Sequence, residues 1–284
     1  MKTGLILEGG AMRGLFSCGV LDVFLENHLD FDGMIGVSAG AAFGCNFKSR
    51  QNGRPIRYNK RFARDKRYCS IASLLKTGDL YNGNFCYHTL PETLDPFDAE
   101  EFSRNPMEFH LVATDVETGR PFYRRCDSAN YDTMEWIRAS ASMPCVSNPV
   151  ERNGRKYLDG GISDAIPLDY FESLGFDRNV VILTRPAGYR KKPSALLPLF
   201  SPFFRKMPEI YRALQSRPQR YNETLERIEE KEKKGEILVI RPPAPLPSGK
   251  VEHNPERMQA TYGIGRAAGS GMLDKIHRFL EKEK

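Results

Sequence analysis

Two short stretches near the N-terminus, GLILEGGAMRG at residues 4–14 and MIGVSAG at residues 34–40, decide the fold of this chain. Each begins with an apolar run of strand length, turns through glycines and continues into residues that suit a helix. The two helices are expected over residues 15–25 and 39–45. Strands that alternate with helices in this way favour a largely parallel sheet covered by helices on both faces. The sequence therefore predicts the α/β fold class.

The composition is that of a folded globular protein, because 40% of the 284 residues are apolar and 27% are charged. At this length we expect one large core, since chains divide into separate cores only beyond roughly 250 to 300 residues. Lys and Arg outnumber Asp and Glu by 42 to 36. This mild excess suits an anionic partner, either a phospholipid surface or a nucleic acid, and does not choose between them.

The sequence shows no signal for membrane insertion, export or metal binding, and our expectations about the compartment and the cofactors follow from this. No stretch approaches the roughly 18 to 20 apolar residues of a membrane-spanning helix, and the mean hydropathy is −0.49. The apolar run before Glu8 is too short for a signal-peptide core. We expect a soluble, cytoplasmic protein, with peripheral attachment to the inner membrane surface as a variant of that expectation. The six cysteines and five histidines show no metal-ligand spacing, so we expect reduced thiols and no metal.

Residues Gly36-Val37-Ser38-Ala39-Gly40 match the nucleophile-elbow pattern. Glycines on either side allow a sharp turn from strand to helix, and the turn leaves the serine hydroxyl exposed. The apolar run before the motif and the small residues after it provide the strand-turn-helix setting that the motif requires. Ser38 is therefore the candidate nucleophile, and the alternative is an ordinary tight turn between a strand and a helix.

The first glycine-rich turn follows a strand and opens a helix, so its backbone N–H groups can converge on an anion. One candidate anion is a nucleotide phosphate, with Asp30 or Asp32 as the acidic residue downstream, but Ala11 stands where the dinucleotide fingerprint has a glycine. The other is the oxyanion of an acyl-transfer intermediate, which the serine elbow favours. The residues of this candidate oxyanion loop are Gly9, Gly10, Ala11, Met12, Arg13 and Gly14.

A serine nucleophile needs a base, and Asp159 in Leu158-Asp159-Gly160-Gly161 is the leading carboxylate. It ends a strand-like segment, and the glycines after it permit close approach; a simple Asp-Gly turn is the structural alternative. A histidine base is also conceivable, because Ser38, Asp159 and His253 follow the chain order of α/β-hydrolase triads. His253 lies in a polar loop bounded by proline, where a surface histidine is the simpler interpretation.

These motifs together resemble those of the patatin-like phospholipases, bacterial branch. The glycine-rich loop at residues 8–14, the nucleophile motif at 36–40 and the Asp-Gly-Gly motif at 159–161 occur in the family's order, and residues 113–119 and 139–144 are similar to family segments. The resemblance covers roughly residues 4–170. It implies a three-layer α/β/α fold with a mostly parallel central sheet. The supporting motif glycines are Gly36, Gly40, Gly160 and Gly161.

The resemblance also implies a function and a mechanism. The protein would be a serine acyl hydrolase of the phospholipase A type that cleaves fatty-acyl esters of phospholipids or related lipids. Ser38 would be the nucleophile and Asp159 its base, without a catalytic histidine, metal or nucleotide. The chain departs from the family at Ala11, where a third glycine is usual, and a positive φ there would cost on the order of 1 to 2 kcal/mol. A catalytically silent lipid-binding or regulatory protein is therefore the alternative.

One domain with two parts is expected, and the sequence indicates the first part more clearly than the second. Residues 1–184 form the patatin-like catalytic core, and residues 185–284 form an extension packed on the same domain. The extension begins with a proline-rich apolar connector and continues with a charged helix over 209–234, a strand over 237–240 and a closing helix over 255–284. Within the connector, Ala195 to Phe204 is flanked by cations. This segment is expected either to contact a membrane surface or to pack on the core or a partner subunit.

The region between residues 50 and 105 is the least legible part of the sequence. Its Arg- and Lys-rich stretch from Arg50 to Arg67 contains Tyr58, Phe62 and Tyr68, which would suit base stacking in a nucleic-acid complex. A solvated helical face is the simpler interpretation, and we expect no nucleic-acid partner. Further along, the sequence predicts a hairpin at Asn153-Gly154 and a helix over 133–140 capped by Asp132.

Overall fold

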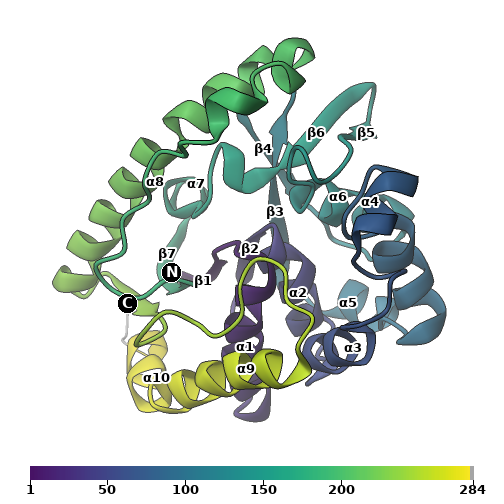
Figure 1. The fold of residues 1–284 in the computed structure, drawn as a ribbon. Helices are drawn as coiled ribbons and strands as arrows, with labels where there is room; N and C mark the ends of the chain where they lie inside the picture. The colour runs from purple at the N-terminus through teal and green to yellow at the C-terminus, as the bar shows by residue number, and fades with distance from the viewer. Residues whose placement is uncertain (282–284) are drawn as a thin grey trace.

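A single sheet of eight strands runs through the computed structural model, which describes residues 1–281 (Figure 1). The strand order is β5-β6-β3-β2-β1-β7-β8, and β4 pairs with β3 off this path. β3, β2, β1, β7 and β8 are parallel neighbours, whereas β4, β5 and β6 pair in antiparallel fashion. The strands are β1 (Lys2–Leu7), β2 (Gly33–Val37), β3 (Glu108–Asp115), β4 (Pro121–Arg125), β5 (Val150–Arg152), β6 (Arg155–Asp159), β7 (Phe176–Ile182) and β8 (Ile237–Ile240).

Helices cover both faces of this sheet, so the predicted three-layer arrangement is confirmed. The α-helices are α1 (Leu15–Glu26), α2 (Ala39–Lys48), α3 (Arg54–Phe62), α4 (Ile71–Thr77), α5 (Ala99–Arg104), α6 (Tyr131–Ser140), α7 (Leu168–Ser173), α8 (Pro208–Lys234), α9 (Pro255–Ser270) and α10 (Leu273–Glu281). Shorter or wider helical turns are η1 (Ala11–Gly14), the π-helix η2 (Phe85–Leu94), η3 (Gly160–Ile162), η4 (Leu197–Phe200) and η5 (Phe203–Lys206).

The central strands are buried on both sides, and alternate side chains enter two separate cores. Leu5 and Leu7 of β1 pack with α1, α2, α6 and α10 on one face. Ile6 of the same strand packs on the other face with α7 and α8. Continuous apolar runs are therefore needed in these strands, which is why the short runs at 5–7 and 34–37 could be recognised from the sequence.

The C-terminal extension shares the sheet and both helical layers with the rest of the chain. β8 pairs with β7, and α8 lies across the α7 face of the sheet (Figure 1). α9 packs directly on α1, where a Cβ built on Gly265 would lie 2.0 Å from the carbonyl oxygen of Phe16. Gly265 thus permits this contact. The boundary at residue 184 stays a prediction.

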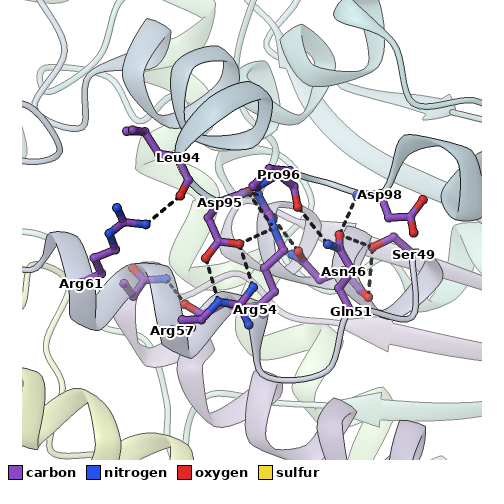
Figure 2. Close-up of polar contacts among 12 residues, drawn as sticks. Asn46, Ser49, Gln51, Arg54, Arg57, Arg61, Leu94, Asp95, Pro96 and Asp98 are labelled. Atoms are coloured by element: carbon purple, nitrogen blue, oxygen red, sulfur yellow. Dashed lines mark hydrogen bonds and ion pairs between the residues drawn. The ribbon is translucent and has the colours of Figure 1, made fainter.

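The solvated face predicted for Arg50 to Arg67 is confirmed for the exposed cations of this stretch and is wrong for Arg54. Arg54 is buried and donates to Asn46 Oδ1 at 2.7 Å, and Arg57 makes a two-point contact with Asp95 at 2.8 Å in each bond (Figure 2). The interleaved aromatic residues Tyr58, Phe62 and Tyr68 are buried in a core cluster. They are therefore not exposed for base stacking.

Other local predictions need smaller corrections. The N-cap of α6 is Asn130, which accepts the Thr133 N–H at 2.9 Å, whereas Asp132 forms an ion pair with Arg152. The closing helix is two helices, α9 and α10, and its predicted last residues, 282–284, lie outside the described residues. The hairpin at Asn153-Gly154 is confirmed, with φ of 50° and 73° at these two residues.

None of the helices described over residues 1–281 is both long enough and apolar enough to cross a membrane.

Candidate active site

Ser38 occupies a strained turn between β2 and α2. Its φ and ψ are 56° and −121°, a conformation that non-glycine residues rarely adopt and that is found mainly at functional sites. Its side chain makes no capping hydrogen bond to α2, although Ser38 is the N-cap residue. The hydroxyl is therefore not engaged in capping the helix, at whose start the partial positive charge favours an anionic oxygen.

The glycines on either side of Ser38 are required by close backbone approach. A Cβ on Gly36 would lie 2.5 Å from the carbonyl oxygen of Gly40, and one on Gly40 would lie 2.5 Å from the carbonyl oxygen of Leu7. Any larger residue would push α2 away from β1 and β2. The strand-turn-helix geometry expected for this segment is present in the structure.

The sheet register brings Asp159 to the same edge as Ser38. Val37 of β2 pairs with Val112 of β3, and the next residue of β3, Ala113, pairs with Asp159 of β6. Ser38 and Asp159 thus lie on opposite sides of one intervening strand, and adjacent strands are only about 4.8 Å apart. The two residues are 121 positions apart in the chain, so only the sheet makes them neighbours.

The carboxyl group of Asp159 is buried and incompletely paired. Its Oδ1 accepts the Gly161 N–H at 2.7 Å, whereas Oδ2 has no hydrogen-bond partner among the described residues. Burial raises the pKa of Asp159, and the nearby Ser38 hydroxyl, Arg217, the Gly161 N–H and Lys250 oppose that rise. A carboxylate with a raised pKa is a stronger base than an exposed aspartate.

The glycine-rich loop lies against Ser38, and Glu8, the residue before the loop, is fixed by buried hydrogen bonds. A Cβ on Gly9 would lie 2.9 Å from Cβ of Ser38. Buried Glu8 accepts hydrogen bonds from the Thr184 N–H and the Tyr221 hydroxyl, each at 2.6 Å. Within the described residues, the N–H groups of Gly9 and Gly10 have no acceptor, so they are free to bind an anion.

The remaining loop residues point in different directions. Ala11 and Met12 line a cavity together with Ser38. Gly14 packs against Ala39 and Phe43 of α2. Ala11 has a φ of 50°, so this alanine does adopt the left-handed conformation that favours glycine.

An apolar cavity of about 410 Å³ opens at Ser38 and runs along α2 toward Cys45. Its volume lies within the ordinary range of small-molecule sites. Most of its wall is aliphatic or aromatic, and the few charged groups include Arg54, Arg138 and Lys250. The apolar lining comprises Met12, Ala39, Ala42, Phe43, Tyr58, Tyr68, Leu80, Tyr81, Tyr87, Leu90, Phe97, Met134, Ile137, Met143, Val146 and Val251.

Sequence reasoning missed most of this cavity wall. Residues 54–97, which gave few periodic signals, supply one side of it through α3, the segment after α4, and η2. η2 is a π-helix, a form that occurs frequently at functional sites. The concentration of aromatic residues between Tyr58 and Phe97 is the signal that could have indicated an apolar site.

The residues of the alternative mechanisms lie elsewhere. His253 is exposed, and its Nδ1 lies 2.7 Å from the carbonyl oxygen of Ala63, outside the cavity lining. Asp32 accepts the N–H and hydroxyl of Thr3, and Asp30 pairs with Arg50. These partners account for both carboxylates without a nucleotide.

Fold and site define an α/β protein in which a serine at a strained turn faces an apolar cavity beside a buried carboxylate. A family model described as patatin-like phospholipase matches residues 5–172, more than half of the chain. The chain belongs to the patatin-like phospholipase family, and the resemblance drawn from the motifs is confirmed. A second model, described as a domain of unknown function, DUF6363, matches residues 207–281.

Relatives cover the whole chain at low identity. The uncharacterized protein YjjU of Escherichia coli K12 is 28% identical over 99% of this chain and 80% of its own length. Lysophospholipase nte1 of Aspergillus niger is 26% identical over 98% of this chain, which spans only 18% of that protein. Among solved structures, VipD from Legionella pneumophila matches 96% of this chain and 67% of its own, with a TM-score of 0.46 and 12% identity.

Proposed function

We propose that this protein is a serine acyl hydrolase that cleaves fatty-acyl esters of phospholipids or related lipids through Ser38 and Asp159. The observation that carries the proposal is the strained turn that presents Ser38 to an apolar cavity, with the buried carboxyl of Asp159 on the other side of one strand. Membership of the patatin-like phospholipase family supports lipid as the substrate class. The name of the Aspergillus relative, lysophospholipase, supports phospholipids or lysophospholipids as the substrates within that class.

The proposed reaction has two half-reactions with one carboxylate. Ser38 Oγ attacks the ester carbonyl while its proton passes to Asp159, and the tetrahedral intermediate expels the alcohol, which takes that proton. Water then attacks the acyl-serine ester and gives a proton to Asp159, and the proton returns to Ser38 as the fatty acid leaves. The raised pKa of Asp159 matches this double role as acceptor and donor.

The glycine-rich loop would stabilise the developing oxyanion. Among the described residues the N–H groups of Gly9 and Gly10 have no partner, and Gly9 lies against Ser38. Preorganised donors of this kind contribute about 3 to 4 kcal/mol each. The cavity along α2 would hold the acyl chain. The alcohol portion of the ester would then lie on the other side of Ser38, toward the C-terminal extension.

The test is covalent labelling followed by turnover. A fluorophosphonate should add once to the protein, and peptide mapping should locate the adduct on Ser38. The Ser38→Ala variant should bind no label and hydrolyse no ester, while Ser173→Ala, an exposed serine on α7, should behave as the wild type. Full activity in Ser38→Ala, or an adduct elsewhere, would refute the proposal.

A catalytically silent lipid-binding protein is the second candidate, and the positive φ of Ala11 favours it. An alanine that is strained in the oxyanion loop could hold the N–H donors away from the geometry that the intermediate requires. Liposome binding that persists in Ser38→Ala, together with no ester cleavage by the wild type, would identify this function.

We further propose that the segment Ala195–Phe204 contacts a membrane surface peripherally in the cytoplasm. Leu196, Leu199, Phe200 and Phe203 are exposed by 61%, 73%, 45% and 50%, whereas Phe204 is buried. Phe204 packs with Ile162, close to the loop that follows Asp159, and so fixes the exposed side chains near the site. Arg205 and Lys206 lie beside them, which suits anionic headgroups.

A further inference from the structure

Five cationic side chains gather beside the glycine-rich loop, and the mechanism above uses none of them. Arg13 belongs to the loop itself, and the other four come from the C-terminal extension. Arg185 and Lys191 lie in the connector after β7, Arg217 lies on α8 and Lys250 follows β8. The connector and α8 are joined by hydrogen bonds between Lys191 and Asn222, so they run side by side (Figure 1).

Within residues 1–281, none of these side chains has a carboxylate at ion-pair distance. In the part of the chain that the structure describes, none of the five makes an ion pair or a side-chain hydrogen bond. The Nε groups of Arg13 and Arg217 are buried without any acceptor. Buried donors are almost always satisfied in folded proteins, so the two Nε groups are available to bind an anion.

The cations also repel one another. Burial, followed by repulsion from Arg217, lowers the pKa of Lys191 to about 7, and burial and Arg185 lower the pKa of Arg13. Glu8 and Asp159 are the carboxylates that interact with this group, and Glu8 is already occupied by Thr184 and Tyr221. The repulsion among these cations thus destabilises the free protein, and a bound anion would reduce that repulsion.

The cluster adjoins the reaction site, and four of its five residues are not part of the acyl cavity's lining. Nη2 of Arg217 lies 3.3 Å from where a Cβ on Gly161 would be, next to Asp159. Lys250 lines the mouth of the cavity and interacts with Arg13, Arg185 and Arg217. Aromatic rings orient two of the cations, Tyr189 under Arg185 at 4.5 Å and Tyr221 under Lys191 at 4.4 Å.

We propose that Arg13, Arg185, Lys191, Arg217 and Lys250 bind the phosphate of the substrate headgroup, so that the preferred substrate is a phosphate-bearing acyl ester such as a lysophospholipid. The inference rests on the proposed function. In such a substrate a short glycerol unit separates the acyl carbonyl from the phosphate. With the chain in the cavity and the carbonyl at Ser38, the phosphate would lie outside the acyl cavity near Arg13 and Arg217, whose guanidinium groups can form two-point contacts with it.

The first test compares two substrates that differ only in the phosphate. The double variant Arg185→Gln/Lys191→Gln avoids the two cations, Arg217 and Lys250, that act on Asp159. In this variant, the ratio of kcat/KM for lysophosphatidic acid to kcat/KM for a monoacylglycerol of the same chain should fall by about 10- to 100-fold. The control Arg212→Gln removes an exposed cation of α8 and should leave the ratio unchanged. An unchanged ratio in the double variant would overturn the assignment.

The second test needs no catalysis, so it separates this inference from the proposed function. Calorimetry on Ser38→Ala should show that dodecyl phosphate binds about 10-fold or more tightly than dodecyl maltoside, and that Arg185→Gln/Lys191→Gln removes the difference. Equal binding of the two amphiphiles would refute the phosphate site. Inorganic phosphate that displaces dodecyl phosphate at comparable concentration would refute the headgroup assignment and indicate a site for free phosphate.

Discussion

Residues 5–172 and residues 185–281 both contribute to the candidate site, but they do so in different ways. The first region holds Ser38, Asp159 and the glycine-rich loop at strand ends, where backbone pairing fixes every position. The second region adds cations and exposed apolar groups from a connector, a long helix and a loop. The reacting groups thus lie at strand ends of the first region, and most of the groups that would bind the headgroup lie on elements of the second region packed against it.

This difference explains why the two regions differ so much in how their sequences can be interpreted. Nucleophilic attack tolerates little displacement, so the reacting groups require specific glycines at specific spacings. A charged cluster tolerates variation in the position and even the identity of each cation, because electrostatic attraction depends weakly on geometry. A site of the first kind can be recognised in the sequence as a motif, whereas a site of the second kind is visible only as cations in the composition. The predictions that follow test this division from the largest expected effect to the smallest.

Asp159→Asn should reduce turnover by about a thousandfold or more, because an amide cannot accept the proton of Ser38. The same variant should be at least as stable as the wild type at pH 7. A raised pKa means that the folded state binds the proton more tightly than the unfolded state, so stability falls as pH rises through the titration. Turnover on a soluble ester and thermal unfolding check both parts. Wild-type activity would show that Asp159 is not the base.

The pH dependence of kcat/KM should reflect both regions, through Asp159 of the first and Arg217 of the second. Asp159 must be ionised to act as a base, so kcat/KM should fall about tenfold per pH unit below the pKa of Asp159. Because burial raises that pKa, this acidic limb of the profile should lie at higher pH than the titration of an ordinary carboxyl group. Arg217 favours the ionised form, so Arg217→Gln should move the limb to higher pH. Profiles measured with a soluble ester, with Arg212→Gln as the matched control, would reveal the shift. A limb that moves to lower pH would contradict the assignment.

The exposed apolar residues of the extension should affect binding to a membrane and not the hydrolysis of a soluble ester. Leu199→Ser/Phe203→Ser should weaken partitioning onto anionic vesicles by about 30-fold, since each partly buried side chain contributes about 1 kcal/mol. Hydrolysis of a soluble ester should be retained. Vesicle sedimentation checks the first expectation. Unchanged partitioning would assign these side chains to a protein contact instead.

The cavity in the first region should set chain length. Cys45 lines its far end along α2, so Cys45→Leu should reduce activity on long acyl chains relative to short ones by about tenfold. Esters of increasing length, assayed beside a thermal unfolding control, measure the effect. An equal loss at every length would place the acyl chain elsewhere.

The smallest effect concerns Ala11. Replacing it with glycine removes the strain of a positive φ and should raise the free energy of unfolding by about 1 kcal/mol. Denaturant unfolding measures the change. A loss of stability would show that the alanine methyl contributes packing that outweighs the strain.

The sequence by itself determined the β1-α1 and β2-α2 units, the hairpin at Asn153-Gly154 and the family, because each depends on residues that are neighbours in the chain. It also indicated Ser38 and Asp159 as candidates. It misplaced the cap of α6 and treated Arg54 as solvated, since a charged residue can be buried only when distant partners such as Asp95 and Asn46 meet it.

Only the tertiary structure decided how these pieces form a site. The sheet register brings Ser38 and Asp159 together across β3, and burial by many segments raises the pKa of Asp159. The cavity joins α2 to residues 54–97, and the cationic cluster joins Arg13 to residues more than 170 positions away. Desolvation and electrostatic repulsion are sums over neighbours in space, and a linear pattern of residues does not contain those neighbours.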